Sequence, residues 1–205
     1  MEKLRTKHVV MTGCNEVCMN RNLYIADTHF GHRNCIQFDD RPFDTIEEHD
    51  ATLISNWNAV VMPDDHVYVV GDFAYRNERP AHCYTDQLHG HIHLIRGNHD
   101  KRTPEYESCF ESVDDILKIR DCLHGEPVEV LLCHYWIPFL PELRRGAYML
   151  HGHTHKGGKE QRLEEELKAK IRQNYKLHRA YNVGCMWQNY YPQTLEQIVA
   201  RQGRE

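Results

Sequence analysis

The chain has 205 residues, of which 40% are hydrophobic and 27% are charged, and its formal net charge is −5. This composition is typical of one soluble globular domain and excludes a disordered chain. A net negative charge disfavours a protein that binds long nucleic acids by broad electrostatic attraction. The longest apolar runs are far shorter than the roughly 20 residues of a membrane helix, so we expect no membrane segment.

The first 20 residues are polar and lack the apolar core of a secretion signal, and we interpret them as an N-terminal extension. The eight cysteines are scattered without regular pairing, which favours reduced thiols and a cytoplasmic location. Residues 21–205 show neither an internal repeat nor a low-complexity linker. They are therefore predicted to form a single domain.

Short runs of β-branched, aromatic and aliphatic residues, bounded by glycine and polar residues, predict strands at several places. Five of them lie at residues 22–26, 67–70, 92–95, 128–133 and 147–150. Two further strands are expected, one at 112–120 ahead of a turn at 124–127 and one at 179–183.

Helices are predicted between these strands. Thr45 and Glu48 have the spacing of a capping box, and an amphipathic pattern follows them up to Pro63. A second helix is expected at 79–88. Thr194 has the same capping spacing to Gln197 and begins a short helix that runs through Ala200.

The segment 156–176 is highly charged, with seven Lys and Arg against four Glu, a net charge of +3. Its apolar residues recur at four-residue steps, as Leu163, Leu167, Ile171 and Tyr175. This predicts a helix with a narrow apolar stripe, enough to lie against a surface but not to enter a core. We therefore expect residues 157–177 to be a solvated helical excursion, with a lid or a partner-binding helix as the alternative.

Each of the first five strands runs into residues that can bind metal ions. In chain order these are Asp27-Thr28-His29, Gly71-Asp72, Gly97-Asn98-His99-Asp100, His134 and His151-Gly152-His153-Thr154-His155. Ligands bind beyond the carboxyl ends of strands in sheets that are flanked by helices, so the five ends can converge on one site. The pattern predicts a metal site there.

The residues available to such a site offer oxygen and imidazole ligands. They are Asp27, His29, Asp72, Asn98, His134, His153 and His155. A pair of divalent ions needs at least one carboxylate that can bridge them. Two ions roughly 3.5–4 Å apart can clamp a phosphoryl oxygen and ionise a water near neutral pH. The glycines at 71, 97 and 152 are predicted to let the backbone turn tightly and to leave room at the site.

Taken together, these motifs resemble those of the calcineurin-like metallophosphoesterase superfamily. The matching segments are Asp-Thr-His-Phe-Gly-His at 27–32, Gly-Asp at 71–72, Gly-Asn-His-Asp at 97–100, His134, and Gly-His-Thr-His at 152–155. The opening motif and Asn182-Val183-Gly184 are most similar to small bacterial and phage members. The resemblance implies an α/β fold, a four-layer α/β/β/α sandwich with two mixed sheets flanked by helices, around a dinuclear centre.

The resemblance also implies a role for each candidate residue. One ion would be held by Asp27, His29, Asp72 and His155. Asp72 would bridge to a second ion held by Asn98, His134 and His153. His99 would face the substrate as a proton donor or transition-state stabiliser, and Asp100 would orient its imidazole. The chain departs from the family after Gly184, where Cys185-Met186 replaces a frequent x-Asp pair.

Other polar residues near these motifs have two interpretations. Arg33 and Arg41 follow the first ligand loop and could contact a phosphate, with surface ion pairing as the alternative. The histidines at 89, 91 and 93 precede Gly97, and a structural role is favoured for them.

The sequence thus predicts a metal-dependent phosphoric ester hydrolase, a phosphodiesterase or phosphatase. It would hydrolyse small phosphate esters, phosphodiesters first, by attack of metal-bound hydroxide. Two divalent ions are the expected cofactors, Mn²⁺ first, with Fe, Zn or Ni as alternatives. The expected partner is the small ester, and no oligomeric state is indicated. A nuclease acting on nucleic acid and a catalytically silent metal-binding fold are the competing hypotheses.

Overall fold

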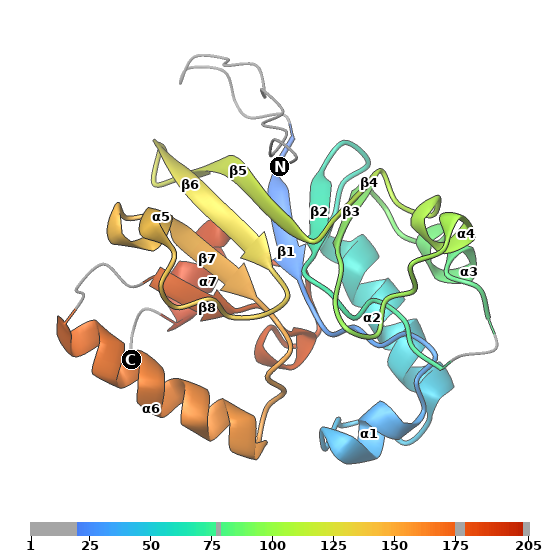
Figure 1. Ribbon diagram of the computed structural model, residues 1–205. Helices are drawn as coiled ribbons and strands as arrows, with labels where there is room; N and C mark the ends of the chain where they lie inside the picture. Colours follow the sequence, from blue (N-terminus) through green and yellow to red (C-terminus); the bar gives the residue numbers. More distant parts are fainter. Residues whose placement is uncertain (1–19, 77–78, 175–178, 203–205) are drawn as a thin grey trace.

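The computed structural model describes residues 20–76, 79–174 and 179–202, and its strands form two four-stranded sheets (Figure 1). The first sheet contains, in spatial order, β1 (Asn22–Ile25), β2 (His66–Val69), β3 (His91–Ile95) and β4 (Ser112–Asp114). The second contains β5 (Ile116–Leu123), β6 (Glu126–Cys133), β7 (Tyr148–His151) and β8 (Arg179–Asn182). The predicted α/β class is confirmed. The extension expected at 1–20 lies, except for Asn20, outside the described residues.

Most strand pairs are parallel. The three pairs of the first sheet are parallel, and an isolated antiparallel bridge joins Tyr24 of β1 to Gln193. In the second sheet β5 and β6 form an antiparallel hairpin, whereas β6–β7 and β7–β8 are parallel. The six strands predicted at 22–26, 67–70, 92–95, 128–133, 147–150 and 179–183 agree with the structure to within two residues at each end.

The helices are α1 (Asn34–Phe38), α2 (Ile46–Val60), α3 (His82–Thr85), α4 (Pro104–Glu107), α5 (Pro141–Arg144), α6 (Lys159–Asn174) and α7 (Leu195–Gln202), with a 3₁₀ turn η1 (Cys185–Trp187). Both predicted helix starts are confirmed, because the side chains of Thr45 and Thr194 accept hydrogen bonds from the backbone N–H of Glu48 and Gln197. The helix predicted at 79–88 is too long, since only the single turn of α3 forms there.

The single strand predicted at 112–120 is wrong, because two strands of different sheets meet there. β4 ends its pairing with β3 at Asp114, and β5 begins its pairing with β6 at Ile116. Between them, the exposed carboxylate of Asp115 pairs with Arg96 and Arg102. The alternation of polar and apolar residues is interrupted at this break, where Asp114-Asp115 is followed by Ile116-Leu117. This interruption is the local sign that the segment is not one strand.

Alternate residues of β1 belong to two different cores, which explains why this strand is apolar throughout. Leu23 and Ile25 pack on the outer side of the first sheet, where α2 adds the fully buried Trp57. Tyr24 faces the second sheet and packs in a core that includes Leu150. Figure 1 shows α2, α3 and α4 on the outer side of the first sheet.

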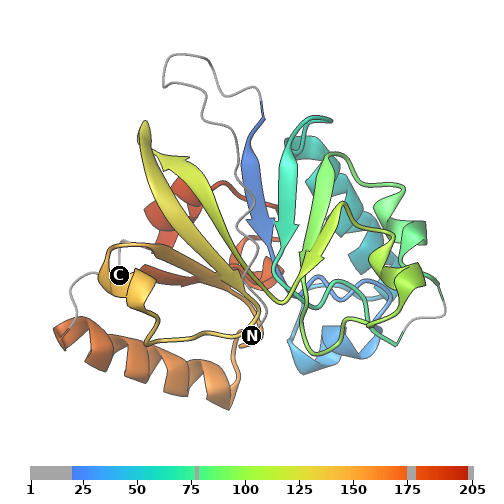
Figure 2. The same cartoon turned by 45° about the horizontal axis from the view of Figure 1, so that its top comes forward.

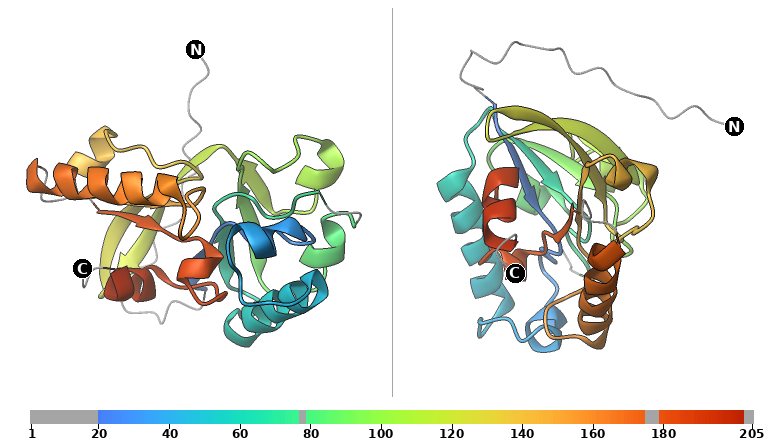
Figure 3. Two further views of the ribbon diagram at one scale, coloured as in Figure 1. Left: turned by 90° about the horizontal axis from the view of Figure 1, so that it is seen from below. Right: turned by 90° about the vertical axis from the view of Figure 1, so that its left-hand side faces the viewer.

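Helices also flank the second sheet, with α5 and α6 on one side and α7 on the other (Figure 3). Leu143 of α5 packs against Met149 of β7 in a small third core, and Leu195 of α7 packs in the core between the sheets. No helix among the described residues is long and apolar enough to cross a membrane.

The apolar stripe predicted for α6 is not its buried face. Leu163 is 67% exposed and Leu167 is 40% exposed, whereas the charged Glu164 and Lys168 are buried. Within the stripe, Ile171 is buried and Tyr175 lies outside the described residues. The helix itself is confirmed and most of its described residues are exposed, but the face that it turns inward differs from the predicted stripe.

Strands of both sheets direct their carboxyl ends toward the seam between the sheets. In Figure 2 the arrowheads of β1, β2 and β3 point to this region from one side, and Figure 1 shows β6 and β7 pointing to it from the other. The loops that follow these five strands carry the motifs singled out in the sequence. The fold therefore gathers the predicted ligands at one place.

Candidate metal centre

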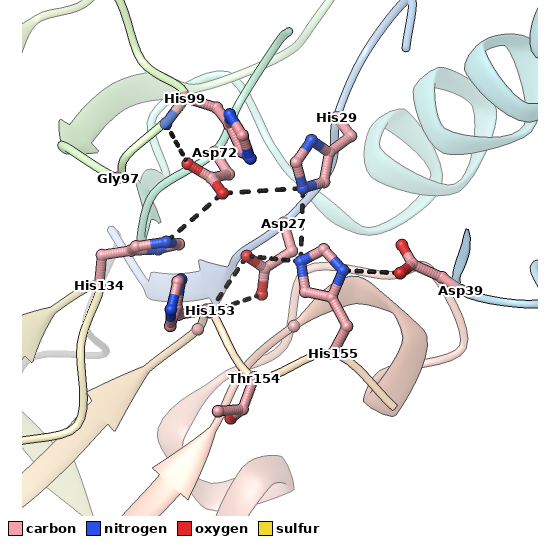
Figure 4. Close-up of polar contacts among 12 residues, drawn as sticks. Asp27, His29, Asp39, Asp72, Gly97, His99, His134, His153, Thr154 and His155 are labelled. Carbon is pink, nitrogen blue, oxygen red and sulfur yellow. Dashed lines mark hydrogen bonds and ion pairs between the residues drawn. The ribbon is translucent and has the colours of Figure 1, made fainter. Parts of the chain in front are cut away.

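Four of the predicted ligands form a compact cluster at this seam (Figure 4). Asp27, His29, Asp72 and His155 each present one ligand atom, and these atoms all lie within 4.8 Å of one another. The first three are buried and His155 is partly buried. Two carboxylates and two imidazoles so close together form a donor set suited to a divalent cation.

Asp72 stands between this cluster and a second group of ligands. Its Oδ2 atom lies 3.7 Å from Nε2 of His29 and 3.4 Å from Nε2 of His134. The amide oxygen of Asn98 lies 3.2 Å from Nε2 of His134 and 3.0 Å from Nδ1 of His153. The structure therefore brings all seven predicted ligands together in two groups that share one carboxylate.

The ligand loops adopt backbone conformations that are costly for residues with side chains. Asp27, His29, Asp72 and His153 have positive φ angles of 55°, 51°, 56° and 70°. Such strain persists only where the surrounding structure enforces it, and it concentrates at functional sites. Here the backbone N–H groups of Asp27 and His29 donate to the carbonyl oxygens of Gly71 and Asp72, at 3.0 Å each.

Three glycines make this close approach possible. A Cβ atom at Gly71 would lie 2.1 Å from Nδ1 of His134, and Gly71 also has a φ of +90°. A Cβ at Gly97 would lie 2.2 Å from Oδ1 of Asp72. One at Gly152 would lie 2.8 Å from the Cβ of Ala26. The space that the sequence led us to expect at 71, 97 and 152 is thus used by neighbouring ligands and backbone.

Hydrogen bonds to the far ring nitrogen orient two of the histidines. Nδ1 of His134 lies 2.9 Å from the carbonyl oxygen of Val70, and Nδ1 of His155 lies 2.7 Å from Oδ1 of Asp39. Both acceptors require a proton on Nδ1. With Nδ1 held in this way, the Nε2 atoms of the two rings face the carboxylates of Asp72 and Asp27. Such partners fix the tautomer and the direction of a metal-binding imidazole.

Arg41 does not face a substrate, in contrast to one of the two sequence interpretations. Its guanidinium is buried and donates to the carboxylate of Asp39 and to the carbonyl oxygens of Asp27 and Thr28. A buried guanidinium needs these acceptors to offset its desolvation, so it is not available to a phosphate. Arg41 instead holds Asp39 against His155. Arg33 is exposed at the start of α1, and its phosphate contact stays a prediction.

Asp100 does not orient the imidazole of His99. Its buried carboxylate accepts from the backbone N–H groups of Gly97, Asp72 and Phe73, at 2.7–3.0 Å. The hydroxyl of Tyr106 donates to it at 2.7 Å. Burial raises the pKa of Asp100. Asp100 thus connects the loop after β3 to the loop after β2, and it does not orient the imidazole ring of His99.

His99 is held in two other ways. Its backbone N–H donates to Oδ1 of Asp72 at 2.9 Å, and its ring centroid lies 3.8 Å from that of Tyr75. The ring also lies 5.4 Å from the ring of His29, so His99 borders the cluster without belonging to either group of ligands. This is a suitable place for a residue that acts on a bound molecule.

The two buried carboxylates are neutralised by two histidines. Burial alone would lower the pKa of His134, yet its hydrogen bond to Asp72 and the nearby charges raise that pKa to about 9. Burial likewise opposes protonation of His155, but Asp27 and Asp39 raise its pKa to about 10. Burial holds the pKa of His29 well below its usual value, so this ring is neutral.

The sequence did not single out several residues that shape the site. They are Asp39, Tyr75, Tyr106 and Glu164, and in its actual role also Arg41. Asp39, Tyr75 and Arg41 contact ligand loops that are distant in the sequence. Tyr106 and Glu164 contact Asp100 and Thr154, which lie 6 and 10 residues earlier. None of these contacts has a recognised local spacing, so the tertiary structure is needed to reveal them.

Comparisons with known proteins identify relatives. The gene 66 protein of Mycobacterium phage L5 is 31% identical over 165 residues, which covers 67% of this chain and 78% of the phage protein. The chain belongs to the family of this phage protein. The uncharacterized protein MJ1445 of Methanocaldococcus jannaschii is 46% identical over 84 residues, 40% of this chain. That match spans only about half of the archaeal protein, 48% of its length. No protein-family model matches the sequence.

The crystal structure of a protein of unknown function from Aquifex aeolicus, AQ665, has the same fold. It aligns with a TM-score of 0.62 over 87% of this chain and 97% of that protein, at 22% identity. An archaeal phosphodiesterase aligns with a TM-score of 0.39 and 17% identity, which is too low to indicate a shared fold.

Metal binding at this cluster should release protons. Since the pKa values of His134 and His155 are raised to about 9 and about 10, both rings are protonated near neutral pH in the metal-free protein. A metal ion binds only the neutral ring, so affinity should rise from about pH 6 to about pH 9. Calorimetric titration with Mn²⁺ in buffers of different ionisation enthalpy measures both effects. An affinity independent of pH, with no proton release, would contradict this assignment.

The same shifts affect the stability of the metal-free fold. A histidine whose pKa is raised on folding adds to the free energy of unfolding, and this contribution is complete below the ordinary pKa of 6.5. It is lost as the pH rises through about 9 for His134 and about 10 for His155. Their contribution to metal-free stability should therefore fall over the range in which metal affinity rises. Thermal unfolding at several pH values, with and without Mn²⁺, is expected to show this divergence.

Asp72 should be the ligand whose loss is most damaging. Asp72→Asn removes the charge that the two groups share, and we expect the variant to hold less divalent metal than the unaltered protein. Elemental analysis of the purified variant measures this, with the exposed Asp64→Asn as the matched control. An unchanged metal content in Asp72→Asn would exclude a bridging role.

Proposed function

We propose that the protein is a dinuclear metal-dependent phosphoesterase of the calcineurin-like type. The position of Asp72 between the two ligand groups is the observation that carries this proposal, because two ions held together need a shared carboxylate. Helices on the outer sides of two sheets also fit the four-layer α/β/β/α sandwich that this superfamily uses. The protein would then be a phosphoric ester hydrolase.

The donor set agrees with this proposal. Asp27, His29, Asp72 and His155 would hold one ion, and Asn98, His134 and His153 would complete the second group with Asp72. Mixed oxygen and imidazole donors suit Mn²⁺, with Fe, Zn or Ni as alternatives. When bound, two such ions supply Lewis acidity toward a phosphoryl oxygen and ionise a water near neutral pH.

His99 would supply a proton to the leaving oxygen. It borders the ligand cluster, and its ring is supported by Tyr75. The hydrogen bond from its backbone to Asp72 ties its position to the ligand that both groups share. Histidine is the side chain that most often serves as a positioned general acid or base.

Two aromatic rings beside the site, the exposed Tyr135 and the partly buried Tyr75, favour a small ester that carries a ring. Tyr135 follows His134, is 44% exposed, and its ring centroid lies 4.8 Å from that of His153. Tyr75 flanks His99, and the guanidinium of Arg76 lies 5.1 Å from its ring centroid. Flat aromatic faces of this kind stack with nucleobases and aryl groups. We therefore propose small phosphodiesters, such as nucleotides, as the substrate class.

A metal-by-substrate screen tests this proposal. Protein loaded with Mn²⁺ should hydrolyse bis(p-nitrophenyl) phosphate and leave plasmid DNA and long RNA largely intact, because a net charge of −5 opposes long polyanions. Asp72→Asn, purified in parallel, reports contaminating activity. Digestion of long nucleic acid without turnover of small diesters would favour the nuclease. No hydrolysis with any metal would favour a silent metal-binding fold.

His99→Ala should separate chemistry from metal binding. Removing a positioned proton donor typically lowers kcat by about 10²–10⁴-fold, and the metal content should stay at two ions because His99 is outside both ligand groups. Steady-state kinetics and elemental analysis on the same preparation provide the comparison. If His99→Ala lost metal together with activity, His99 would be a ligand instead.

A further inference from the structure

The buried face of helix α6 includes two charged residues, Glu164 and Lys168, beside Ile171 of its apolar stripe. The side chains of Glu164 and Lys168 are about nine-tenths buried, while Leu163 and Leu167 of the same helix face solvent. An amphipathic helix normally buries the opposite face. Burying two charged groups is costly unless each is fully hydrogen-bonded, so their partners should reveal why this face is turned inward.

Lys168 connects the helix to the end of strand β7. Its Nζ atom lies 2.6 Å from Oε1 of Glu164 and 2.9 Å from Nε2 of the fully buried His151. Because an ammonium group can only donate, Nε2 of His151 accepts, and the ring proton is on Nδ1. That nitrogen lies 3.1 Å from the carbonyl oxygen of Gly152, to which it donates.

Glu164 connects the helix to the loop that carries two candidate ligands. Its Oε2 atom accepts a hydrogen bond of 2.6 Å from the hydroxyl of Thr154. The amide of Asn182 donates to the hydroxyl and to the carbonyl oxygen of Thr154, at 3.0 and 2.9 Å. Both hydrogen-bonding functions of the Thr154 hydroxyl are therefore used, and the residue is fixed from both sides.

Thr154 lies between His153 and His155, one in each ligand group, and Figure 4 shows its side chain directed away from the cluster. His153 has a φ of 70°, a conformation that must be held by its surroundings. The backbone N–H of His153 donates to the carboxylate of Asp27 at 3.2 Å, which secures one end of the loop. The contacts from α6 hold the neighbouring Thr154 and the residue that precedes the loop, His151.

We propose that Glu164 and Lys168 are positioning residues, which set the geometry of both metal-ligand groups by fixing Thr154 and His151. The proposal rests on the metal centre proposed above. It assigns a role to a charged helix that the reaction itself does not use. It differs from the lid alternative, in which α6 would have to release the loop that holds His153 and His155.

The test is a variant that keeps the helix packed and removes only its polar contacts. Replacing a buried ion pair by apolar residues of similar size often preserves stability. Glu164→Leu combined with Lys168→Met should therefore leave the melting temperature near that of the wild type. Because loss of partners outside the ligand set costs about 10–100-fold in metal affinity, Mn²⁺ binding should weaken by that factor.

The matched control is an exposed pair on the same helix with the same spacing, Arg162→Met combined with Glu166→Leu. This control should bind Mn²⁺ as the wild type does. Metal affinity is measured by competition with a fluorescent chelator, beside thermal unfolding of the metal-free proteins. A folded Glu164→Leu/Lys168→Met protein with wild-type affinity would overturn the proposal.

A second pair of variants avoids the helix altogether. Thr154→Val removes the hydroxyl group that donates a hydrogen bond to Glu164, and it leaves the ion pair between Glu164 and Lys168 intact. Thr154→Ser keeps the hydroxyl group. We expect weakened Mn²⁺ binding for Thr154→Val and recovery for Thr154→Ser. Equal, wild-type affinity for both would overturn the proposal even if the double variant failed to fold.

The outcomes separate this inference from the proposed function. If the wild type binds Mn²⁺ and the Thr154 and Glu164 variants weaken it, the inference holds whether or not any phosphate ester is hydrolysed. If the wild type hydrolyses esters but these variants bind metal normally, the inference alone fails. If the wild type binds no divalent ion, both fail.

Discussion

Two buried carboxylates at the ends of neighbouring strands are the constraint around which the site is organised. Asp27 and Asp72 are almost completely inaccessible to solvent, and the charge of Asp27 disfavours ionisation of Asp72. Such a pair is tolerable only if positive charge lies between or beside it. In the metal-free protein the imidazolium groups of His134 and His155 supply that charge. Divalent ions would supply it better, and they would displace the protons.

Much of the surrounding architecture serves to hold these groups in place. Arg41 and Asp39 restrain His155, and Asp100 restrains the backbone at Asp72. None of these three residues needs to touch a metal ion or a substrate. A charged residue near a site is therefore not necessarily a binding residue. Residues that support the site can be recognised because their charged groups are buried and hydrogen-bonded to other parts of the protein. The desolvation cost of burying these charged groups is offset by the hydrogen bonds that they form, and these bonds also fix their positions.

The sequence predicted the elements whose evidence is local. Strand ends and the capped helices were found because apolar periodicity and capping spacing depend on neighbouring residues. The ligands could be grouped because each follows a strand whose direction the parallel topology determines. The roles of Arg41 and Asp100 could not be predicted, because their partners lie in other loops. The inward face of α6 was predicted wrongly, since periodicity assumes that apolar side chains are the buried ones.

The candidate ligands differ in exposure within both groups. Asp27, His29, Asp72 and His134 are buried, whereas Asn98 is exposed and His153 and His155 are partly exposed. The buried side is closed by the strands themselves and by the Arg41–Asp39 pair. A molecule from solvent would therefore meet Asn98, His153 and His155 before the buried residues.

Two aromatic side chains border the cluster. The ring centroid of His99 lies 5.4 Å from that of His29, and its backbone N–H also donates to Asp72. Tyr135 makes an edge contact with the ring of His153 and is 44% exposed. Helix α6 connects to the ligand loop through Thr154, whose side chain points away from the cluster (Figure 4). The loop of His153 and His155 is thus held from outside the cluster, by Glu164 through Thr154 and by Asp39 through His155. Ring nitrogens of the two histidines face Asn98 and Asp27, where a metal ion could lie.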